Sequence, residues 1–299
     1  MSNQYDIKVI DGTQTVCEVC GSKEDPIVKY GRYNAVNKNL YHICECEYCH
    51  FQFVYPKPSE ESLTVFYNTH SKNDYKNYVA ARELKIKWAS FLLDVVERFK
   101  KPFGKLLDVG CASGFAMEAA KAKGWDPYGI DISAENLMFV TEGLKCRVQC
   151  GTLSQITLSD EYQLVLMFDV LEHVPSPRET LLKIKKLLMP EGLVAFTLPC
   201  IDSFSGKFFG RSWYHYAPPA HLNYFDIKTF AMLCDDLGFE IIHHQWIKKI
   251  FTLNYLMNQI ITTYLTKDKK SLSFPLIGEK NVSFGMGERL IIVKNKMLF

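Results

Sequence analysis

Two acidic residues and two glycines lie at the ends of neighbouring apolar runs between residues 104 and 132. In the segment LLDVGCASGF, residues 106–115, Asp108 closes an apolar run, where a carboxylate is costly to bury unless it meets a polar partner. Gly110 and Gly114 let the backbone turn tightly and approach a ligand before a helix begins. Asp131 ends the next apolar run, where its carboxylate can accept hydrogen bonds from ribose hydroxyls. This pattern predicts a nucleoside site.

The order of the small and acidic residues indicates which nucleoside fits. A dinucleotide site that holds a pyrophosphate uses GxGxxG, whereas this chain places Gly110, Ala112 and Gly114 after an acid. The carboxylate of Asp108 would repel a pyrophosphate and attract a cation. S-adenosylmethionine carries an α-ammonium and a sulfonium, so it is the expected cofactor. A nicotinamide-dependent oxidoreductase is the least favoured alternative.

Five of the ten cysteines fall within the first 50 residues, and this clustering favours metal binding over disulfides. Two CxxC pairs supply four thiolates, which is the ligand set of a closed, structural zinc site. We expect the zinc ligands to be Cys17, Cys20, Cys46 and Cys49. Cys44 is a spare ligand at CxC spacing. The five later cysteines are expected to be small buried residues.

Histidines in two loops are candidates for proton transfer. S-adenosylmethionine, the cofactor expected above, is a methyl donor, and transfer of its methyl group needs a positioned acceptor and, usually, a base that removes the acceptor's proton. His173, in the segment LEHVPSP, has an ordinary pKa near neutrality and is the first candidate. His215 and His221, in RSWYHYAPPAHLNYF, could be a base or hydrogen-bond donors. The alternatives are that Glu172 or His173 only braces its loop, and that the other two pack inside theirs.

Alternating elements must position these side chains. From residue 105 to 199, apolar runs alternate with helical patterns, which predicts parallel βαβ units with helices on both faces of a sheet. One expected helix spans 177–192, and the next strand spans 193–199. The closing strands 239–247 and 289–295 have no crossover helix between them, which predicts an antiparallel edge.

Composition shifts divide the chain into parts. The segment FVYPKPSEES, residues 53–62, has two prolines among polar residues and is typical of a domain junction. We therefore expect a zinc ribbon over residues 1–60 and a larger domain over 61–299. Within the latter, residues 200–225 are expected to form an acceptor loop and 250–287 an insertion. The apolar segment 250–265 is interrupted by asparagines and a glutamine, so a packed or interfacial helix is expected there.

The overall charge limits the classes of partner that the protein is expected to bind. The 299 residues are 47% hydrophobic and carry a net charge of +2 from 35 basic and 33 acidic side chains, which is too balanced for a dedicated nucleic-acid binder. There is no secretory signal pattern and no apolar run long enough for a transmembrane helix, so a cytoplasmic location is expected. The oligomeric state cannot be inferred from these features.

Four motifs together resemble the class I S-adenosylmethionine-dependent methyltransferases over about residues 75–295: LLDVGCASGF, YGIDIS, CGTLSQI and LVLMFDVLEHVPSP. The resemblance implies a Rossmann-like, seven-stranded, mostly parallel sheet with an antiparallel closing strand. It also implies that a set of residues after successive strands holds the cofactor, namely Asp108, Gly110, Cys111, Gly114, Phe115, Asp131, Ile132, Thr152, Leu153, Phe168 and Asp169.

The cysteine-rich segment is similar to an N-terminal zinc module found on a branch of these enzymes that includes sugar C-methyltransferases and other enzymes of glycan and natural-product pathways. The Pro-Pro-Tyr motif of amino-group methyltransferases is absent after the fourth strand, which favours an oxygen or carbon acceptor. We therefore expect methyl transfer to a small-molecule or glycan-linked acceptor.

Two other functions compete with this interpretation. An RNA methyltransferase could use the zinc ribbon to bind its substrate, but the acids of the ribbon disfavour phosphate contacts. A noncatalytic cofactor-binding partner subunit is the other alternative.

Overall fold

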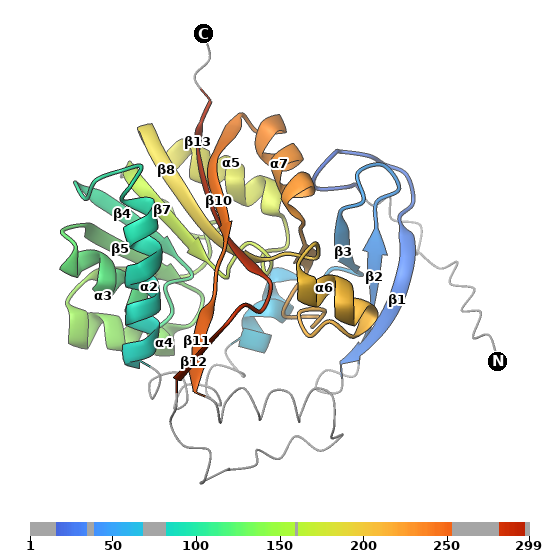
Figure 1. Cartoon of the computed structure of the whole chain (residues 1–299), viewed down its shortest axis with the longest axis horizontal. Helices are drawn as coiled ribbons and strands as arrows, with labels where there is room; N and C mark the ends of the chain where they lie inside the picture. The colour runs from blue at the N-terminus through green and yellow to red at the C-terminus, as the bar shows by residue number, and fades with distance from the viewer. Residues whose placement is uncertain (1–15, 35–38, 68–81, 159–160, 253–280, 297–299) are drawn as a thin grey trace.

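The structure is a computed structural model that describes residues 16–34, 39–67, 82–158, 161–252 and 281–296. Figure 1 shows a large sheet covered by helices beside a smaller sheet near the N-terminus. The segment 250–265, expected to be a packed or interfacial helix, lies mostly outside the described residues. None of the helices within these ranges is long and apolar enough to cross a membrane.

The large sheet has seven strands in the order β10-β13-β8-β7-β4-β5-β6. Its strands are β4 (Lys105–Val109), β5 (Asp126–Asp131), β6 (Arg147–Cys150), β7 (Tyr162–Phe168), β8 (Leu188–Pro199), β10 (Phe239–Trp246) and β13 (Glu288–Asn295). Only β13 runs against its neighbours β8 and β10, while the other pairs are parallel. The predicted fold class, with its antiparallel closing strand, is confirmed.

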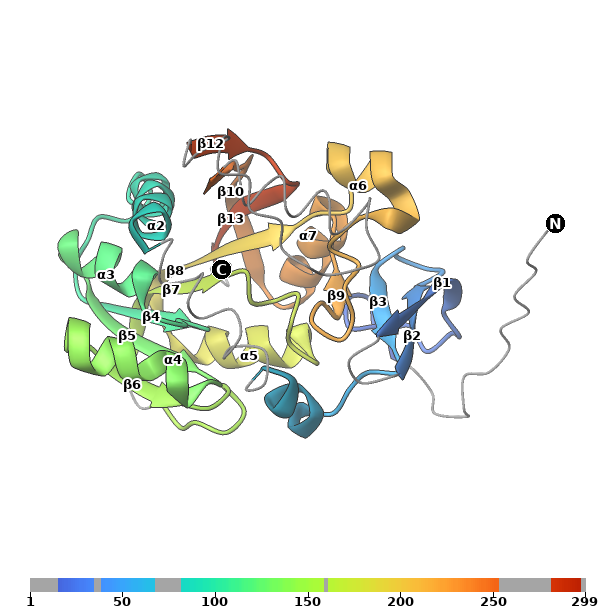
Figure 2. The same ribbon diagram turned by 90° about the horizontal axis from the view of Figure 1, so that it is seen from below.

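Helices cover both faces of this sheet, as Figure 2 shows for α2 and α5. The helices are α2 (Arg82–Val96), α3 (Phe115–Ala122), α4 (Ala134–Phe139), α5 (Pro177–Leu187), α6 (Phe204–Phe209) and α7 (Ile227–Asp236), with a π-helical turn at Val140–Leu144 and a 3₁₀ turn at Gly210–Ser212. Buried residues of α2 and α3, such as Leu92 and Ala120, form one core with Leu106. Leu181 of α5 and Phe230 of α7 belong to the core on the other face.

The smaller sheet joins the N-terminal segment to residues 200–225, the expected acceptor loop. Its antiparallel strands follow the order β1 (Ile27–Asn34), β2 (Asn39–Glu45), β3 (Gln52–Tyr55) and β9 (Asn223–Tyr224). The first three belong to the expected ribbon, whereas β9 comes from residues 200–225. The boundary at residue 60 stays a prediction, but the two segments share one sheet.

Two details differ from the sequence expectation. The helix expected over 177–192 ends at Leu187, and β8 begins at Leu188. Pro190 disfavours a helical conformation at the residue before it, and Glu191 has a φ of 61°, so the chain leaves the helix early.

The expected insertion, residues 250–287, includes most of a two-stranded sheet of β11 (Lys249–Thr252) and β12 (Asn281–Phe284).

Candidate active site and structural metal site

The turn between β4 and α3 approaches the strand ends closely. Gly110 and Gly114 have φ values of 71° and 76°, in the left-handed region that favours glycine. A Cβ atom on Gly110 would lie 2.6 Å from Cγ2 of Val170. The turn is fixed by the N–H groups of Gly110 and Cys111, which both donate to the carbonyl of Ile130. The local sequence therefore gives a backbone cradle that a larger side chain would fill.

Asp108 lies near the end of β4, just before this turn. Its side chain is buried, and its Oδ2 atom has no hydrogen-bond partner among the described residues. Burial, and secondly the nearby Asp131, raise the pKa of Asp108 to about 8. A cationic ligand would stabilise its ionised form, so this carboxyl fits the ammonium group expected of the cofactor.

Asp131 closes the same site from the end of β5. Its Oδ2 accepts the N–H of Ala112 at 2.9 Å, and its Oδ1 accepts the N–H of Ser133 at 2.8 Å. A carboxylate has further lone pairs, so both oxygens can still accept ribose hydroxyls. Burial raises the pKa of Asp131, although these backbone N–H groups oppose the shift.

The remaining predicted cofactor residues surround these two acids. Cys111 and Phe115 are buried beside the turn, and Phe168 ends β7. Ile132, Thr152 and Leu153 are half-buried in the turns after β5 and β6, which the Gly151 N–H joins by donating to the Asp131 carbonyl at 2.8 Å. The structure thus places these predicted cofactor residues at one edge of the sheet, where open α/β folds bind ligands.

Asp169 holds a charged network that the sequence did not reveal. Its Oδ1 accepts from the Thr197 hydroxyl at 2.8 Å, and its Oδ2 lies 2.7 Å from Lys249 Nζ. Lys249 also lies 3.1 Å from Oε1 of the buried Glu288. Burial alone would raise the pKa of Asp169, but Lys249 outweighs it and the pKa falls below its usual value. No local motif marks Lys249 or Glu288, because they come from β11 and β13.

His173 is held by contacts to its Nδ1 atom. This atom lies 2.7 Å from the carbonyl oxygen of Ala220 and 3.0 Å from the hydroxyl of Tyr67. Since a carbonyl only accepts, Nδ1 carries the proton, and Nε2 of the neutral ring keeps its lone pair. A quarter of the side chain is exposed. Burial lowers the pKa of His173, so the ring stays neutral near pH 7 and can accept a proton at Nε2.

The other two candidate histidines lie beside His173. The ring centroid of His221 is 4.7 Å from that of His173 and 5.3 Å from that of His215. His215 Nε2 lies 3.7 Å from Glu288 Oε1. Burial lowers the pKa of both histidines well below the usual value. The three residues therefore form one group, here called the histidine cluster, in which His215 is buried and the other two are half-buried. The cluster reaches the Lys249 network through Glu288.

Glu172 supports both a structural and a chemical interpretation. Its carbonyl accepts the N–H groups of Leu222 and Asn223, so its backbone braces the acceptor loop. Its side chain is almost fully buried, and burial raises its pKa well above the usual value, with Asp169 adding to the shift. Ligand atoms of Glu172, His173 and His221 lie within 4.8 Å of one another, so these groups could share a proton or hold a metal ion.

The comparisons with known proteins agree with this geometry. The profile of a family described as a methyltransferase domain matches residues 80–244, which is more than half of the chain. The chain belongs to the S-adenosylmethionine-dependent methyltransferases. The matched region contains the cofactor cradle, Asp131 and His173, whereas the whole cysteine-rich segment precedes it.

Curated relatives and solved structures extend the comparison. Ubiquinone biosynthesis O-methyltransferase of Bordetella avium is 26% identical over 42% of this methyltransferase and 53% of its own length. The Haemophilus ducreyi protein of the same name is 33% identical over 31% of this chain and 44% of its own. The chain therefore spans about half the length of these relatives.

Among solved structures, the 1,6-didemethyltoxoflavin-N1-methyltransferase of Burkholderia thailandensis has a TM-score of 0.53 at 13% identity, covering 89% of this chain and 99% of its own. A Clostridium acetobutylicum S-adenosylmethionine-dependent methyltransferase has a TM-score of 0.51 at 13% identity, covering 78% and 100%. At this identity the likeness supports the fold alone.

The four cysteines expected to bind zinc come together in the methyltransferase. The Sγ atoms of Cys17 and Cys49, and those of Cys20 and Cys46, are 3.6 Å apart. A tetrahedral zinc ion with Zn–S bonds of about 2.3 Å separates its sulfurs by about 3.8 Å, so the donor set fits zinc. Cys44 is not part of this group, and burial raises the pKa of its thiol to about 12.

The first cysteine pair also contacts the loop that carries His173. Glu18 lies between Cys17 and Cys20, and its carboxylate accepts from Lys57 Nζ at 2.9 Å and from Ser176 Oγ at 2.7 Å. Ser176 caps α5, which follows that loop. Arg178 donates to the carbonyls of Glu18 and Val19 at 2.8 and 2.7 Å. The four-cysteine cluster is thus directly attached to the loop that carries His173.

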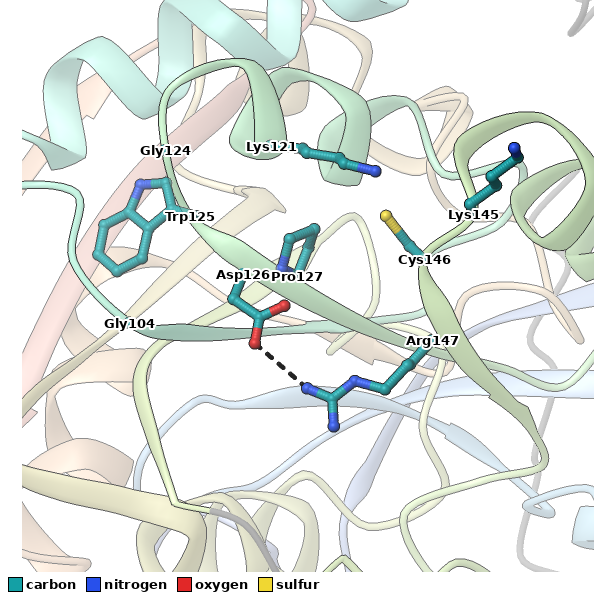
Figure 3. A pocket seen from close by; sticks show the side chains of 9 residues that line it. All are labelled: Gly104, Lys121, Gly124, Trp125, Asp126, Pro127, Lys145, Cys146 and Arg147. Atoms are coloured by element: carbon teal, nitrogen blue, oxygen red, sulfur yellow. Dashed lines mark hydrogen bonds and ion pairs between the residues drawn. The ribbon is translucent and has the colours of Figure 1, made fainter.

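A pocket of about 350 Å³ lies elsewhere on the methyltransferase (Figure 3). Its lining includes Lys121, Trp125 and the ion pair between Asp126 and Arg147, which are 3.3 Å apart. These two residues begin β5 and β6, so the pocket lies at the amino-terminal edge of the sheet. The cofactor cradle lies at the opposite edge.

Proposed function

We propose that this methyltransferase transfers a methyl group to an oxygen or carbon atom of a small-molecule or glycan-linked acceptor. The observation that carries the proposal is His173, whose protonated Nδ1 is held by the Ala220 carbonyl while Nε2 can accept a proton. The names of the curated relatives favour oxygen as the acceptor atom. S-adenosylmethionine, when bound, supplies an electrophilic methyl group on its sulfonium.

Each residue of the proposed site has a separate role. We assign Asp108 to the cationic part of the cofactor and Asp131 to its ribose, with the turns after β5 and β6 beside the adenine. His173 accepts the proton of the acceptor at Nε2. His221 and His215 stay neutral because burial lowers their pKa values. Zinc on Cys17, Cys20, Cys46 and Cys49 would serve a structural role.

Replacement of His173 tests the assignment of the base. His173→Ala should leave the affinity for S-adenosylhomocysteine unchanged and lower kcat by about a hundred- to ten-thousandfold, the usual contribution of a general base. In the wild type, kcat should fall on the acid side of a pKa below about 6.5, because burial lowers the pKa of His173 and protonation removes the base. His243→Ala, on the edge strand β10, is the matched control.

An unchanged kcat in His173→Ala would reduce His173 to a structural role. Repeating the assay after chelation separates two ways in which the cluster could act. If chelation lowers turnover while the four-cysteine metal remains bound, Glu172, His173 and His221 hold an ion instead of a proton.

The acceptor class requires a separate measurement. Radiolabelled methyl from S-adenosylmethionine should be followed into a cell extract fractionated into nucleotide sugars and small metabolites, lipid-linked glycans, RNA and protein. Label in the small-molecule or glycan fractions supports the proposal. Label in RNA would support the competing RNA methyltransferase, and label in no fraction would favour a noncatalytic cofactor-binding subunit.

A further inference from the structure

Large aromatic side chains project into solvent at the start of the acceptor loop. Phe204 and Phe208 of α6 are 83% and 70% exposed, and their rings stack with centroids 5.7 Å apart. Phe204 and the half-exposed Trp246 line the same groove, of about 450 Å³. Arg289 covers one face of Trp246 at 3.5 Å from the ring centroid. Exposed aromatic groups gathered in this way mark an interaction surface more often than scattered apolar residues do.

Most of the charged side chains around these rings are positive. Lys207 and Arg211 are exposed on α6 and the following turn, and Lys248 is exposed beside Trp246. Lys207 lines the groove itself, and the Cγ atom of Lys248 is 3.9 Å from a Cβ placed on Gly285, another lining residue. Asp202 also lines the groove, but its Oδ2 atom is paired with Arg289 at 3.0 Å, and no Asp or Glu occurs in residues 203–215 or 245–252. The aromatic–basic surface, defined as Phe204, Lys207, Phe208, Arg211, Trp246 and Lys248, therefore complements an anionic partner.

This surface is connected to the histidine cluster by one layer of side chains. The indole N–H of Trp213 donates to Ser205 Oγ of α6 at 3.2 Å. The ring of Trp213 lies 4.8 Å from that of His215. Figure 2 shows α6 projecting on the same side of the molecule as β12, clear of the large sheet. A partner on this surface would thus lie next to the acceptor loop.

We propose that the aromatic–basic surface docks the protein on an anionic membrane surface. Aromatic rings are favoured at the boundary between lipid headgroups and acyl chains, and nearby lysine and arginine side chains are attracted to anionic lipids. Phe204 and Phe208 can enter the interface while Lys207 and Arg211, which flank Phe208 and Phe209, contact the headgroups. This peripheral contact needs no membrane-spanning helix, and it does not depend on the proposed methyl acceptor.

Sedimentation with lipid vesicles tests the proposal. The full chain should bind vesicles that contain phosphatidylglycerol and bind phosphatidylcholine vesicles weakly, with the difference shrinking at high salt. Phe204→Ser with Phe208→Ser should lower the partition coefficient by about tenfold or more, because two apolar rings no longer enter the interface. Lys207→Glu with Arg211→Glu should remove the preference for the anionic lipid.

A control and a second measurement keep the test decisive. Phe103→Ser removes a ring that is 75% exposed in the loop before β4, and it should bind vesicles as the wild type does. Circular dichroism confirms that each variant is folded. Vesicle binding that is absent in the wild type, or unchanged in the Phe204/Phe208 variant, would overturn the proposal. So would a dimer in analytical ultracentrifugation that the same variant dissociates, since a second copy would then cover the surface.

Discussion

The proposed cofactor side of the sheet is built from neighbours in the sequence, whereas the proposed acceptor side is built from distant segments. Asp108, Gly110 and Asp131 lie within one βαβ unit, and their contacts are set by two turns. On the acceptor side, His173 contacts Tyr67 and Ala220, and the network continues to Lys249 and Glu288. The comparison teaches that the proposed cofactor site depends on local turn geometry, while the proposed acceptor site depends on how the whole molecule assembles.

Among the changes on the acceptor side, loss of the zinc ion should lower turnover the most. Cys46→Ser should release zinc from a chain that otherwise binds one ion, because a site that loses one of four thiolates no longer closes around the metal. Turnover should then fall, since Glu18 between the first cysteine pair holds Ser176 and Arg178 near the active-site loop. Metal analysis by mass spectrometry and methyl-transfer assays give the two readouts.

Cys150, which the sequence predicted to be buried but which is exposed at the end of β6, provides the control for this experiment. Cys150→Ser should retain its zinc. The comparison between the two sides would be wrong if Cys46→Ser lost its zinc and bound cofactor poorly yet kept its turnover at saturating cofactor.

A substitution in the glycine-rich turn should affect the cofactor side alone. Gly110→Ala should weaken S-adenosylhomocysteine binding by about a hundredfold, because the methyl group would meet Val170 at 2.6 Å and the left-handed backbone would be strained. Isothermal titration calorimetry measures the loss. Gly143→Ala, where an added Cβ meets nothing within 4 Å, is the matched control. Equal affinity in the two variants would contradict the assignment of the cradle.

Removal of the Lys249 charge should destabilise the acceptor side. Lys249→Met leaves Asp169 and the buried Glu288 without their cation, which should lower the free energy of unfolding by about 2–4 kcal/mol after allowing for the partial exposure of Asp169. Urea denaturation measures the change. Glu288→Gln in the same chain should restore part of the loss, and a double variant as unstable as the single one would show that the network is not coupled.

The smallest expected effect is the pH dependence of S-adenosylhomocysteine binding. Burial and Asp131 raise the pKa of Asp108 to about 8, and a cationic ligand favours the ionised form. Below this pH, binding must first displace a proton, so the Kd for S-adenosylhomocysteine should rise by up to about tenfold for each unit of falling pH. Calorimetry from about pH 6 to about pH 9 gives the slope. Asp108→Asn should flatten most of the dependence, whereas a flat profile in the wild type would argue against this role.

The two sides also differ in how far the sequence predicted them. Asp108, Gly110, Gly114 and Asp131 carried local signals, because a parallel βαβ unit imposes a fixed order of strand, turn and helix. The alternation of elements likewise predicted the seven-stranded sheet, and the error at residues 188–192 came from giving Gly192 more weight than Pro190.

The acceptor side could be predicted only in part. His173, His215 and His221 were candidates because of their chemistry, but nothing in the sequence placed their rings together. Tyr67, Lys249 and Glu288 belong to segments whose local patterns indicate only helix or strand. Their meeting depends on long-range pairing, such as β13 entering between β8 and β10, which a single sequence does not specify.

The pairing of β3 with β9 has a consequence for engineering. Gln52 and Phe53 face Tyr224 and Asn223 across two strands, and Asn223 in turn donates to the carbonyls of Leu171 and Val174. Consider a chimera that exchanges residues 200–225 between two such enzymes but keeps the original first 60 residues. Its β3 and β9 strands would no longer carry side chains that fit each other. The amino-terminal segment and residues 200–225 would therefore have to be exchanged together, as one unit.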